Sequence, residues 1–195
     1  MDGSRGSGTV FFSGWNLECL FCQNRPISLG RPGRTLSVEQ LGEVFLALQD
    51  KGVHNLNLVN PTHQARAVLD ALDGLGDRLK IPVAWNSGGY ESVATLRALA
   101  GRISIWMPDL KFMDEHLSHR LAMAPDYFAH AAPAILEMVK QAPAPVFDAE
   151  GLLLEGVVIR HLVLPGHTRD SIRILEWIAA HCGGAVLVSL MGQYT

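Results

Sequence analysis

The sequence predicts an α/β protein built on a parallel sheet, and three observations lead to this fold class. Short β-like runs alternate with helical patterns along the chain of 195 residues. The predicted strand at residues 157–164 is almost continuously apolar, as parallel strands covered on both faces are. We count six strands, each of the first five followed by a helix or a crossover, which is the pattern of an α/β protein. Pattern alone leaves two architectures open, a partly closed (β/α)6 barrel and an open doubly wound sheet.

The elements follow one another with clear start and stop signals. The first strand is predicted at residues 9–12 and the first helix at residues 37–49, where Ser37 and Gln40 form a capping box and Gly52 stands beyond the helix end. The later strands are predicted at residues 53–59, 82–85, 103–107, 157–164 and 185–190. The later helices are predicted at residues 62–75, 91–99, 125–141 and 168–180, with a hairpin at 146–153.

Composition excludes several classes of protein. Apolar residues make up 48% of the chain and charged residues 18%, which indicates one ordered globular domain over residues 1–195. The net charge is −3 and no Lys/Arg cluster is present, so we expect no nucleic-acid partner. No apolar run approaches the ~18 residues of a membrane span, and the polar start does not resemble a signal peptide. Three cysteines, an odd number, favour the reducing cytoplasm over a disulfide framework.

Polar residues follow the predicted strands at their carboxyl ends, where ligands bind in both candidate architectures. Asp109 and Lys111 are two residues apart after one strand, so they can share a face. Arg160 and His161 interrupt an otherwise apolar strand, and only one of the two can face a barrel interior. The alternative for Arg160 is a buried ion pair under the helices. Trp85 and Trp106 lie on strands and are expected in the core.

A Cys-x-x-Cys motif, Cys19 to Cys22, comes shortly after the first strand. From the residues alone it has three interpretations: half of a zinc site, a redox pair, or two ligands of an iron–sulfur cluster. A zinc site needs further ligands at matching spacing, and the sequence has no second Cys-x-x-Cys and no His-x3-His.

The surroundings of this motif carry a resemblance to a known family. Residues 6–24 resemble the cluster loop of radical S-adenosylmethionine (SAM) enzymes, in which Cys-x3-Cys-x2-Cys binds a [4Fe–4S] cluster. The blocks at 57–63, 85–91, 108–111, 160–166 and 189–195 look like those of an uncharacterised subgroup similar to the pyruvate formate-lyase activating enzyme. The resemblance implies a partial (β/α)6 barrel as a single radical SAM core, shorter at both ends than in the family.

The same resemblance implies the cofactors and the activity. Cys19 and Cys22 match the second and third cluster ligands, whereas Trp15 stands at the first position, and an indole cannot ligate iron. The implied activity is reductive cleavage of SAM for hydrogen abstraction, impaired here by Trp15. The implied partners are a protein substrate, such as a glycyl-radical-type enzyme, and an electron donor such as flavodoxin or ferredoxin. The alternative is a non-catalytic barrel that binds SAM or a partner without a stable cluster.

The resemblance also suggests which residues meet SAM. Lys111 can pair with the SAM carboxylate, Asp109 can bond to its ammonium or ribose, and Asn60 and Thr62 can accept hydrogen bonds from the ammonium. The full set of predicted cofactor-binding residues is Asn60, Thr62, Asn86, Ser87, Asp109, Lys111, Arg160 and His161. A substitute for the missing cluster ligand is not expected from Cys182, at the opposite face; the nearer candidates are His63, His161 and His167.

Overall fold

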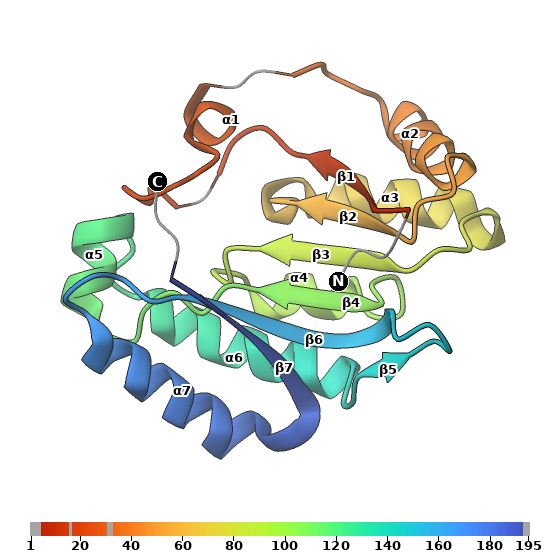
Figure 1. Cartoon of the computed structure of the whole chain (residues 1–195). Helices are drawn as coiled ribbons and strands as arrows, with labels where there is room; N and C mark the ends of the chain where they lie inside the picture. The colour runs from red at the N-terminus through yellow and green to blue at the C-terminus, as the bar shows by residue number, and fades with distance from the viewer. Residues whose placement is uncertain (1–4, 16, 31–32, 193–195) are drawn as a thin grey trace.

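The computed structural model describes residues 5–15, 17–30 and 33–192. Predictions that fall on Asn16 and on residues 193–195 therefore lie outside the described residues. Parallel pairing joins six strands in the spatial order β1 (Ser7–Phe11), β2 (Asn55–Val59), β3 (Val83–Ser87), β4 (Ile105–Pro108), β6 (Leu153–Leu162) and β7 (Val186–Met191). Within the described part of the chain no pairing joins β1 to β7, so the sheet curves without closing (Figure 1). The predicted partial barrel of parallel strands is confirmed.

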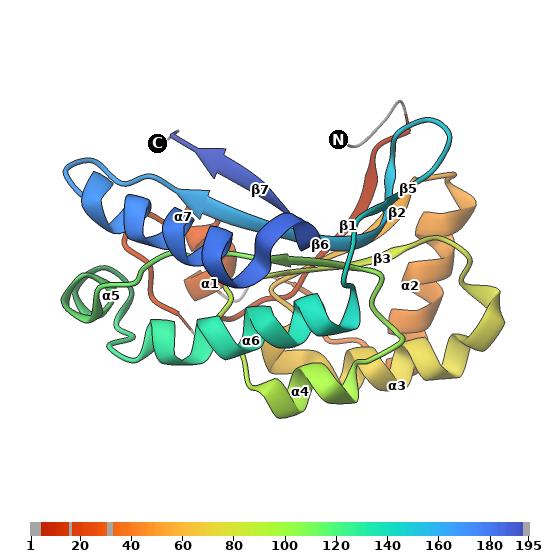
Figure 2. The same ribbon diagram turned by 90° about the horizontal axis from the view of Figure 1, so that it is seen from below.

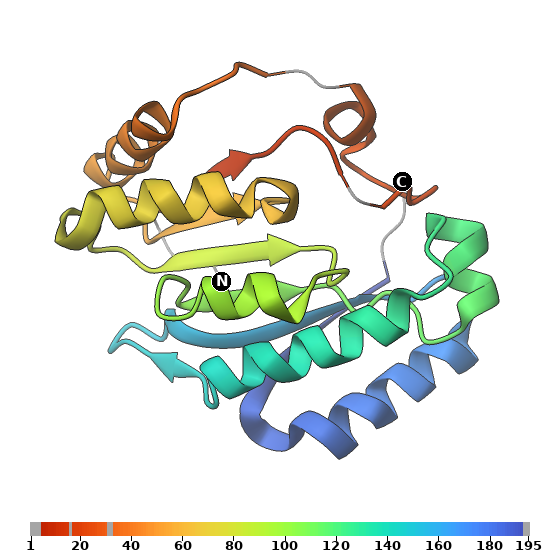
Figure 3. The same cartoon turned by 180° about the vertical axis from the view of Figure 1, so that it is seen from behind.

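Helices cover the convex face of this sheet. They are α2 (Val38–Asp50), α3 (Ala65–Leu75), α4 (Val93–Ala98), α6 (Tyr127–Gln141) and α7 (Thr168–Cys182), and Figures 2 and 3 show them on one side of the strands. Two short helices, α1 (Arg25–Gly30) and α5 (Glu115–Ala122), lie near the carboxyl ends of the strands (Figure 1). The predicted hairpin is present, because β5 (Val146–Phe147) pairs antiparallel with β6.

Alternation along the strands divides apolar from polar side chains. Leu56 and Leu58 of β2, Trp85 of β3 and Trp106 of β4 are fully buried under the helices, and the two indoles meet edge to face at 6.3 Å. The intervening residues face the concave side; there, Thr9 of β1 lies beside Asn57 of β2 in register. The core therefore lies between sheet and helices, and polar groups remain on the inner face.

Local signals account for the accuracy and the errors of the predicted helices. The capping box of α2 is confirmed, since Ser37 Oγ accepts the Gln40 amide and the Gln40 side chain accepts the Ser37 amide. The helix predicted from residue 62 begins instead with a 3-10 turn, Thr62–Gln64. Helices α1 and α5 were not predicted: each is short, and α5 begins at Asp114, whose carboxylate caps Leu117. Among the described residues, no helix is long and apolar enough to cross a membrane.

Candidate functional site

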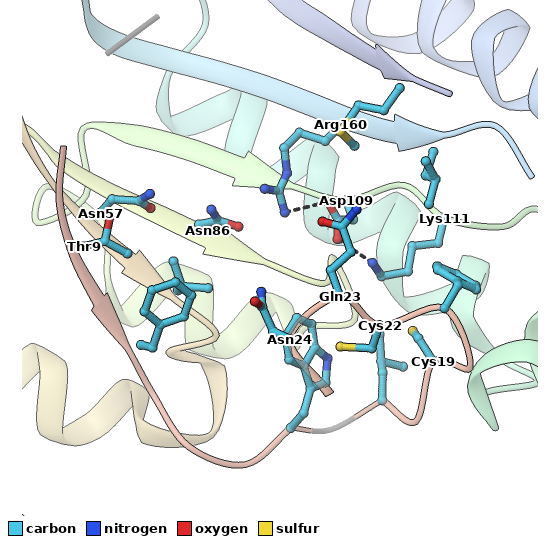
Figure 4. A pocket seen from close by; sticks show the side chains of 17 residues that line it. Thr9, Cys19, Cys22, Gln23, Asn24, Asn57, Asn86, Asp109, Lys111 and Arg160 are labelled. Atoms are coloured by element: carbon cyan, nitrogen blue, oxygen red, sulfur yellow. Dashed lines mark hydrogen bonds and ion pairs between the residues drawn. The ribbon is translucent and has the colours of Figure 1, made fainter. Parts of the chain in front are cut away.

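A cavity of about 430 Å³ lies at the carboxyl ends of the strands, on the concave face. Drug-sized ligands commonly occupy cavities of roughly 300–1,000 Å³. Six of the residues predicted from the sequence line it: Cys19, Cys22, Asn86, Asp109, Lys111 and Arg160 (Figure 4). They come from the loop after β1, from β3, from the segment after β4 and from β6, so the fold brings four separate parts of the chain together.

Asp109 is the centre of a charged cluster in this cavity. Its Oδ1 lies 2.6 Å from Nη2 of Arg160, and its Oδ2 forms an ion pair with Nζ of Lys111 (Figure 4). Backbone geometry sets this arrangement, because Asp109 and Arg160 face each other in a parallel bridge and the Leu110 amide donates to the Arg160 carbonyl at 2.9 Å. Two cations against one anion leave the cluster with a net positive charge toward the cavity.

The cluster stabilises its own charged forms. Burial acts to raise the pKa of Asp109, but the Lys111 ammonium and the Arg160 guanidinium outweigh it, and the pKa lies below its usual value. Burial likewise acts to lower the pKa of Lys111, whereas Asp109 raises it above its usual value. Both residues are therefore charged at neutral pH.

Tyr127 and Gly89 hold the ends of β3 and β4 beneath this cluster. The Tyr127 hydroxyl lies 2.8 Å from the Gly88 carbonyl and 2.7 Å from the Asp109 carbonyl, and it accepts the Lys111 amide at 3.0 Å. Gly89 has a φ of +77°, and a Cβ at this position would lie 2.0 Å from the Asp109 carbonyl oxygen. The two segments approach so closely that only glycine fits.

The loop that carries the two cysteines is anchored by backbone bonds and apolar contacts. The Glu18 and Leu20 amides donate to the Ala122 and Leu121 carbonyls at 3.2 and 2.9 Å, and the Leu17 side chain is buried. The Cys19 thiol is buried and the Cys22 thiol is half-buried; burial raises the pKa of Cys19. The loop thus has a defined position that rests on protein contacts.

Trp15 also lines the cavity, at the position that the resemblance gives to the first cluster cysteine. Its indole packs against Gly88: a Cβ at residue 88 would lie 3.4 Å from Nε1 and 3.5 Å from Cζ2 of Trp15, and 3.0 Å from Cδ1 of Leu17. The indole N–H is buried and has no hydrogen-bond partner among the described residues. Trp15 is therefore a wall of the cavity.

Three predicted residues lie near the cavity but do not line it. Thr62 donates its hydroxyl to Oε1 of Glu91 at 3.0 Å, and Ser87 also hydrogen-bonds to this carboxylate. Glu91 accepts the Trp85 indole N–H as well, at 3.0 Å; burial raises the pKa of Glu91. Asn60, with a φ of 58°, is buried, and its side-chain amide has no partner among the described residues. Asn86 lines the cavity and Ser87 does not, because successive side chains of a strand point to opposite faces of the sheet.

His161 is the fourth predicted residue that the structure keeps away from the cavity. Its Nδ1–H donates to the Leu110 carbonyl at 2.6 Å, and its Nε2 accepts the Ser171 hydroxyl at 2.8 Å. His161 is buried on the convex side of the sheet, against α7, whereas Arg160 faces the cavity. As expected for adjacent residues of a strand, only one of the two faces inward, and that residue is Arg160. The structural alternative for Arg160, an ion pair under the helices, is excluded by this placement.

Four polar residues that the sequence analysis did not predict also line the cavity; they belong to β1, to β2 and to the loop just before α1. They are Thr9, Asn57, Gln23 and Asn24 (Figure 4). A usable signal existed for Asn57, because Asn55 and Asn57 alternate with buried leucines on β2. Thr9 could have been found only with the strand register, which places it opposite Asn57.

No protein-family model matches the sequence. Comparison with curated proteins finds a relative. An uncharacterized protein of Methanocaldococcus jannaschii, MJ0674, is 30% identical over 198 residues, which cover 96% of this chain and 53% of the relative. The chain thus spans about half the length of the curated relative it matches.

Comparison with solved structures identifies the fold. SuiB of Streptococcus suis, solved bound to S-adenosylmethionine, matches 96% of this chain and 39% of its own, with a TM-score of 0.64 and 15% identity. The radical S-adenosylmethionine methyltransferase TsrM of Kitasatospora setae, solved with cobalamin and a [4Fe–4S] cluster, matches 97% of this chain and 37% of its own (TM-score 0.68, 10% identity). The protein anSMEcpe with bound AdoMet matches 96% and 52% (TM-score 0.62, 10% identity). The chain has the fold that these three proteins share.

Of SAM and a [4Fe–4S] cluster, the two groups that the sequence resemblance implies, the cavity residues fit only SAM. SAM combines a carboxylate, an ammonium, a sulfonium and an adenosine, and the cavity offers a net positive cluster, amide side chains and apolar walls such as Phe11 and Leu162. Asn57 Oδ1 and Arg160 Nε are buried without partners among the described residues, so hydrogen-bonding capacity remains at the cavity. A [4Fe–4S] cluster does not fit the donor set, because the cavity presents two thiols and an indole.

Proposed function

We propose that this chain binds S-adenosylmethionine in the concave cavity. The observation that carries the proposal is the cluster of Asp109, Lys111 and Arg160, which leaves a positive charge in a cavity at the carboxyl ends of a SAM-protein fold. A buried cation is costly unless it is paired, and Asp109 can fully compensate only one of the two. A ligand carboxylate supplies the second negative charge.

The remaining walls suit the other parts of the ligand. Thr9 of β1 and Asn57 of β2 lie side by side in register, and Asn86 of β3 lies further along, opposite Val59. The three side chains line the cavity and can donate to and accept from a ribose or an adenine edge. Val59, Leu162 and Met191 offer apolar surface for the adenine faces. A mixed lining with few charged groups is typical of small-molecule cavities.

Titration calorimetry with SAM tests the proposal on the full chain and on Lys111→Met. Loss of the ammonium removes a charge-assisted contact worth about 1.5–3 kcal/mol, so we expect the affinity to fall roughly 10- to 100-fold. The control Lys80→Met removes a lysine from an exposed position and should change the affinity less than about twofold. Decarboxylated SAM, which lacks the carboxylate, should bind Lys111→Met and the unchanged chain equally.

Absence of SAM binding to the unchanged, folded chain would refute the proposal. Equal weakening by Lys111→Met and Lys80→Met would refute the assignment of the carboxylate to this cluster. Circular dichroism of both variants shows whether the fold is intact.

A second candidate function is favoured by the two cysteines in the cavity wall: reductive cleavage of SAM for hydrogen abstraction, as in activating enzymes. Its partners would be a protein substrate of the glycyl-radical type and an electron donor such as flavodoxin or ferredoxin. This candidate requires a third iron ligand in place of Trp15. Formation of 5′-deoxyadenosine from SAM under anaerobic reduction supports it, and SAM recovered intact from a chain that binds it contradicts it.

A further inference from the structure

Trp15 lines the corner of the cavity where the motif Cys-x3-Cys-x2-Cys has its first cysteine. Its indole rests on Gly88, where a methyl group would make ordinary van der Waals contact with the indole and would press on Leu17 at 3.0 Å. The ring is thus seated in a close-packed position, and the loop is tied to α5 by the Glu18 and Leu20 amides. The corner is filled by apolar packing.

Among the described residues, no neighbouring side chain replaces the missing ligand. Across residues 5–15, 17–30 and 33–192, no three His, Cys, Asp or Glu side chains form a group able to hold a metal ion. His63 donates its Nε2–H to the Ser13 carbonyl at 2.8 Å, and His167 accepts a bond from Arg120 at 3.2 Å. Cys182 lies at the end of α7, next to the start of β7 and therefore at the opposite end of the sheet.

We infer that this cavity is a SAM site without an iron–sulfur cluster, and that Trp15 is the residue that excludes the cluster. Each side chain needed for SAM is positioned by protein contacts alone: Asp109 by its bridge to Arg160, and Lys111 by Asp109 and by the Tyr127 hydroxyl. The SAM part of this inference rests on the proposed function; the cluster part rests on Trp15.

Iron and acid-labile sulfide, measured per chain after anaerobic reconstitution, test the cluster part. The unchanged chain and the control Trp15→Phe, which keeps an aromatic ring and adds no thiol, should each hold well under one iron. Trp15→Cys restores three thiols at the spacing Cys-x3-Cys-x2-Cys and should hold about four irons, the content of a [4Fe–4S] centre. Absorption near 400 nm and electron paramagnetic resonance after reduction identify the cluster type.

A second variant keeps the test decisive if Trp15→Cys folds poorly. Trp15→Ala opens the same corner without adding a ligand, and a small thiol such as 2-mercaptoethanol in the buffer can then enter it. Iron should rise toward about four per chain with the added thiol, whereas the unchanged chain in the same buffer should stay well under one.

The outcomes separate the two parts of the inference. About four irons in the unchanged chain overturn the inference and leave the proposed SAM binding standing. Failure of both Trp15→Cys and thiol-supplemented Trp15→Ala to gain iron overturns the role of Trp15. SAM binding to the iron-free, unchanged chain supports the inference; its absence there overturns both the SAM part and the proposed function, while the iron counts still decide the cluster part.

Discussion

At the scale of single residues, the site depends on a few positions that admit one side chain. Gly89 is the clearest case, because its φ is +77° and the Asp109 carbonyl oxygen occupies the space that a Cβ would need. The Tyr127 hydroxyl joins the same carbonyl to that of Gly88. These contacts fix the backbone positions from which the Asp109 and Lys111 side chains extend into the cavity.

Gly89→Ala should therefore lower the free energy of unfolding by more than about 3 kcal/mol, since strain and a backbone clash add together. Urea unfolding followed by circular dichroism measures the loss. Gly184→Ala is the matched control, because a Cβ there meets no atom within 4 Å, and it should change stability by less than about 1 kcal/mol. Equal effects of the two substitutions would contradict the close approach seen at Gly89.

Asp109 gives a prediction about pH. Its folded-state pKa lies below the ordinary 3.8, so its stabilising contribution is complete above the unfolded-state pKa and is lost as the pH falls through the lower, folded-state pKa. Asp109→Asn leaves the partly buried cations of Lys111 and Arg160 without an anion and should cost up to about 3–5 kcal/mol at pH 7. The difference from the unchanged chain should shrink on acidification below about pH 3.8, as urea titrations at pH 7 and pH 3 would show. A constant difference would mean that the pKa of Asp109 is the same in the folded and the unfolded chain, which would contradict its lowered folded-state pKa.

At the scale of elements, β6 carries two adjacent residues with different roles, one at the cavity and one in the packing against a helix. Arg160 faces the cavity and pairs with Asp109, whereas His161 faces α7 and connects Leu110 to Ser171. The sequence showed that the two must point to opposite faces, and it also placed the charged pair Asp109 and Lys111 after a strand. Which of Arg160 and His161 points inward depends on the side that the helices cover, and adjacent residues alone carry no information about that side.

Arg160→Met should consequently affect mainly SAM affinity, and His161→Phe mainly the stability of the fold. Arg160→Met should weaken SAM binding about tenfold or more, because it removes one of the two cavity cations. His161→Phe should cost about 1–3 kcal/mol of stability by leaving the Leu110 carbonyl and the Ser171 hydroxyl unpaired, and should change SAM affinity less than about twofold. Calorimetry and urea unfolding on both variants separate the effects, and loss of SAM affinity in a folded His161→Phe would refute the assignment.

At the scale of the whole molecule, the sheet curves around a hollow that side chains do not fill. Thr9, Asn57 and Asn86 line this hollow from three neighbouring strands, and Asn57 Oδ1 is buried and unpaired among the described residues. Closed barrels of this type fill their interior with layers of branched apolar side chains. A hollow with polar walls is expected to gain stability when a ligand satisfies those groups.

SAM should accordingly raise the thermal unfolding midpoint of the iron-free chain. At a concentration of one hundred times the dissociation constant, linkage predicts about 2.7 kcal/mol, which corresponds to roughly 5–10 °C for a chain of this size. Differential scanning calorimetry with and without SAM measures the shift. Adenosine, which lacks the carboxylate, should give a smaller one, and an equal shift with adenosine would argue against a role for the charged cluster.

The amino-acid sequence by itself determined the alternation of strands and helices, the parallel sheet, the motif of Cys19 and Cys22 and the anomaly at Trp15, because these features are local in the chain. Tertiary structure alone decided which polar residues share the cavity. It brought in Thr9 and Asn57 and turned Thr62, Ser87 and His161 toward other partners. The physical reason is that a cavity is defined by the register between strands and by the face that the helices cover, and both result from packing between segments far apart in the sequence.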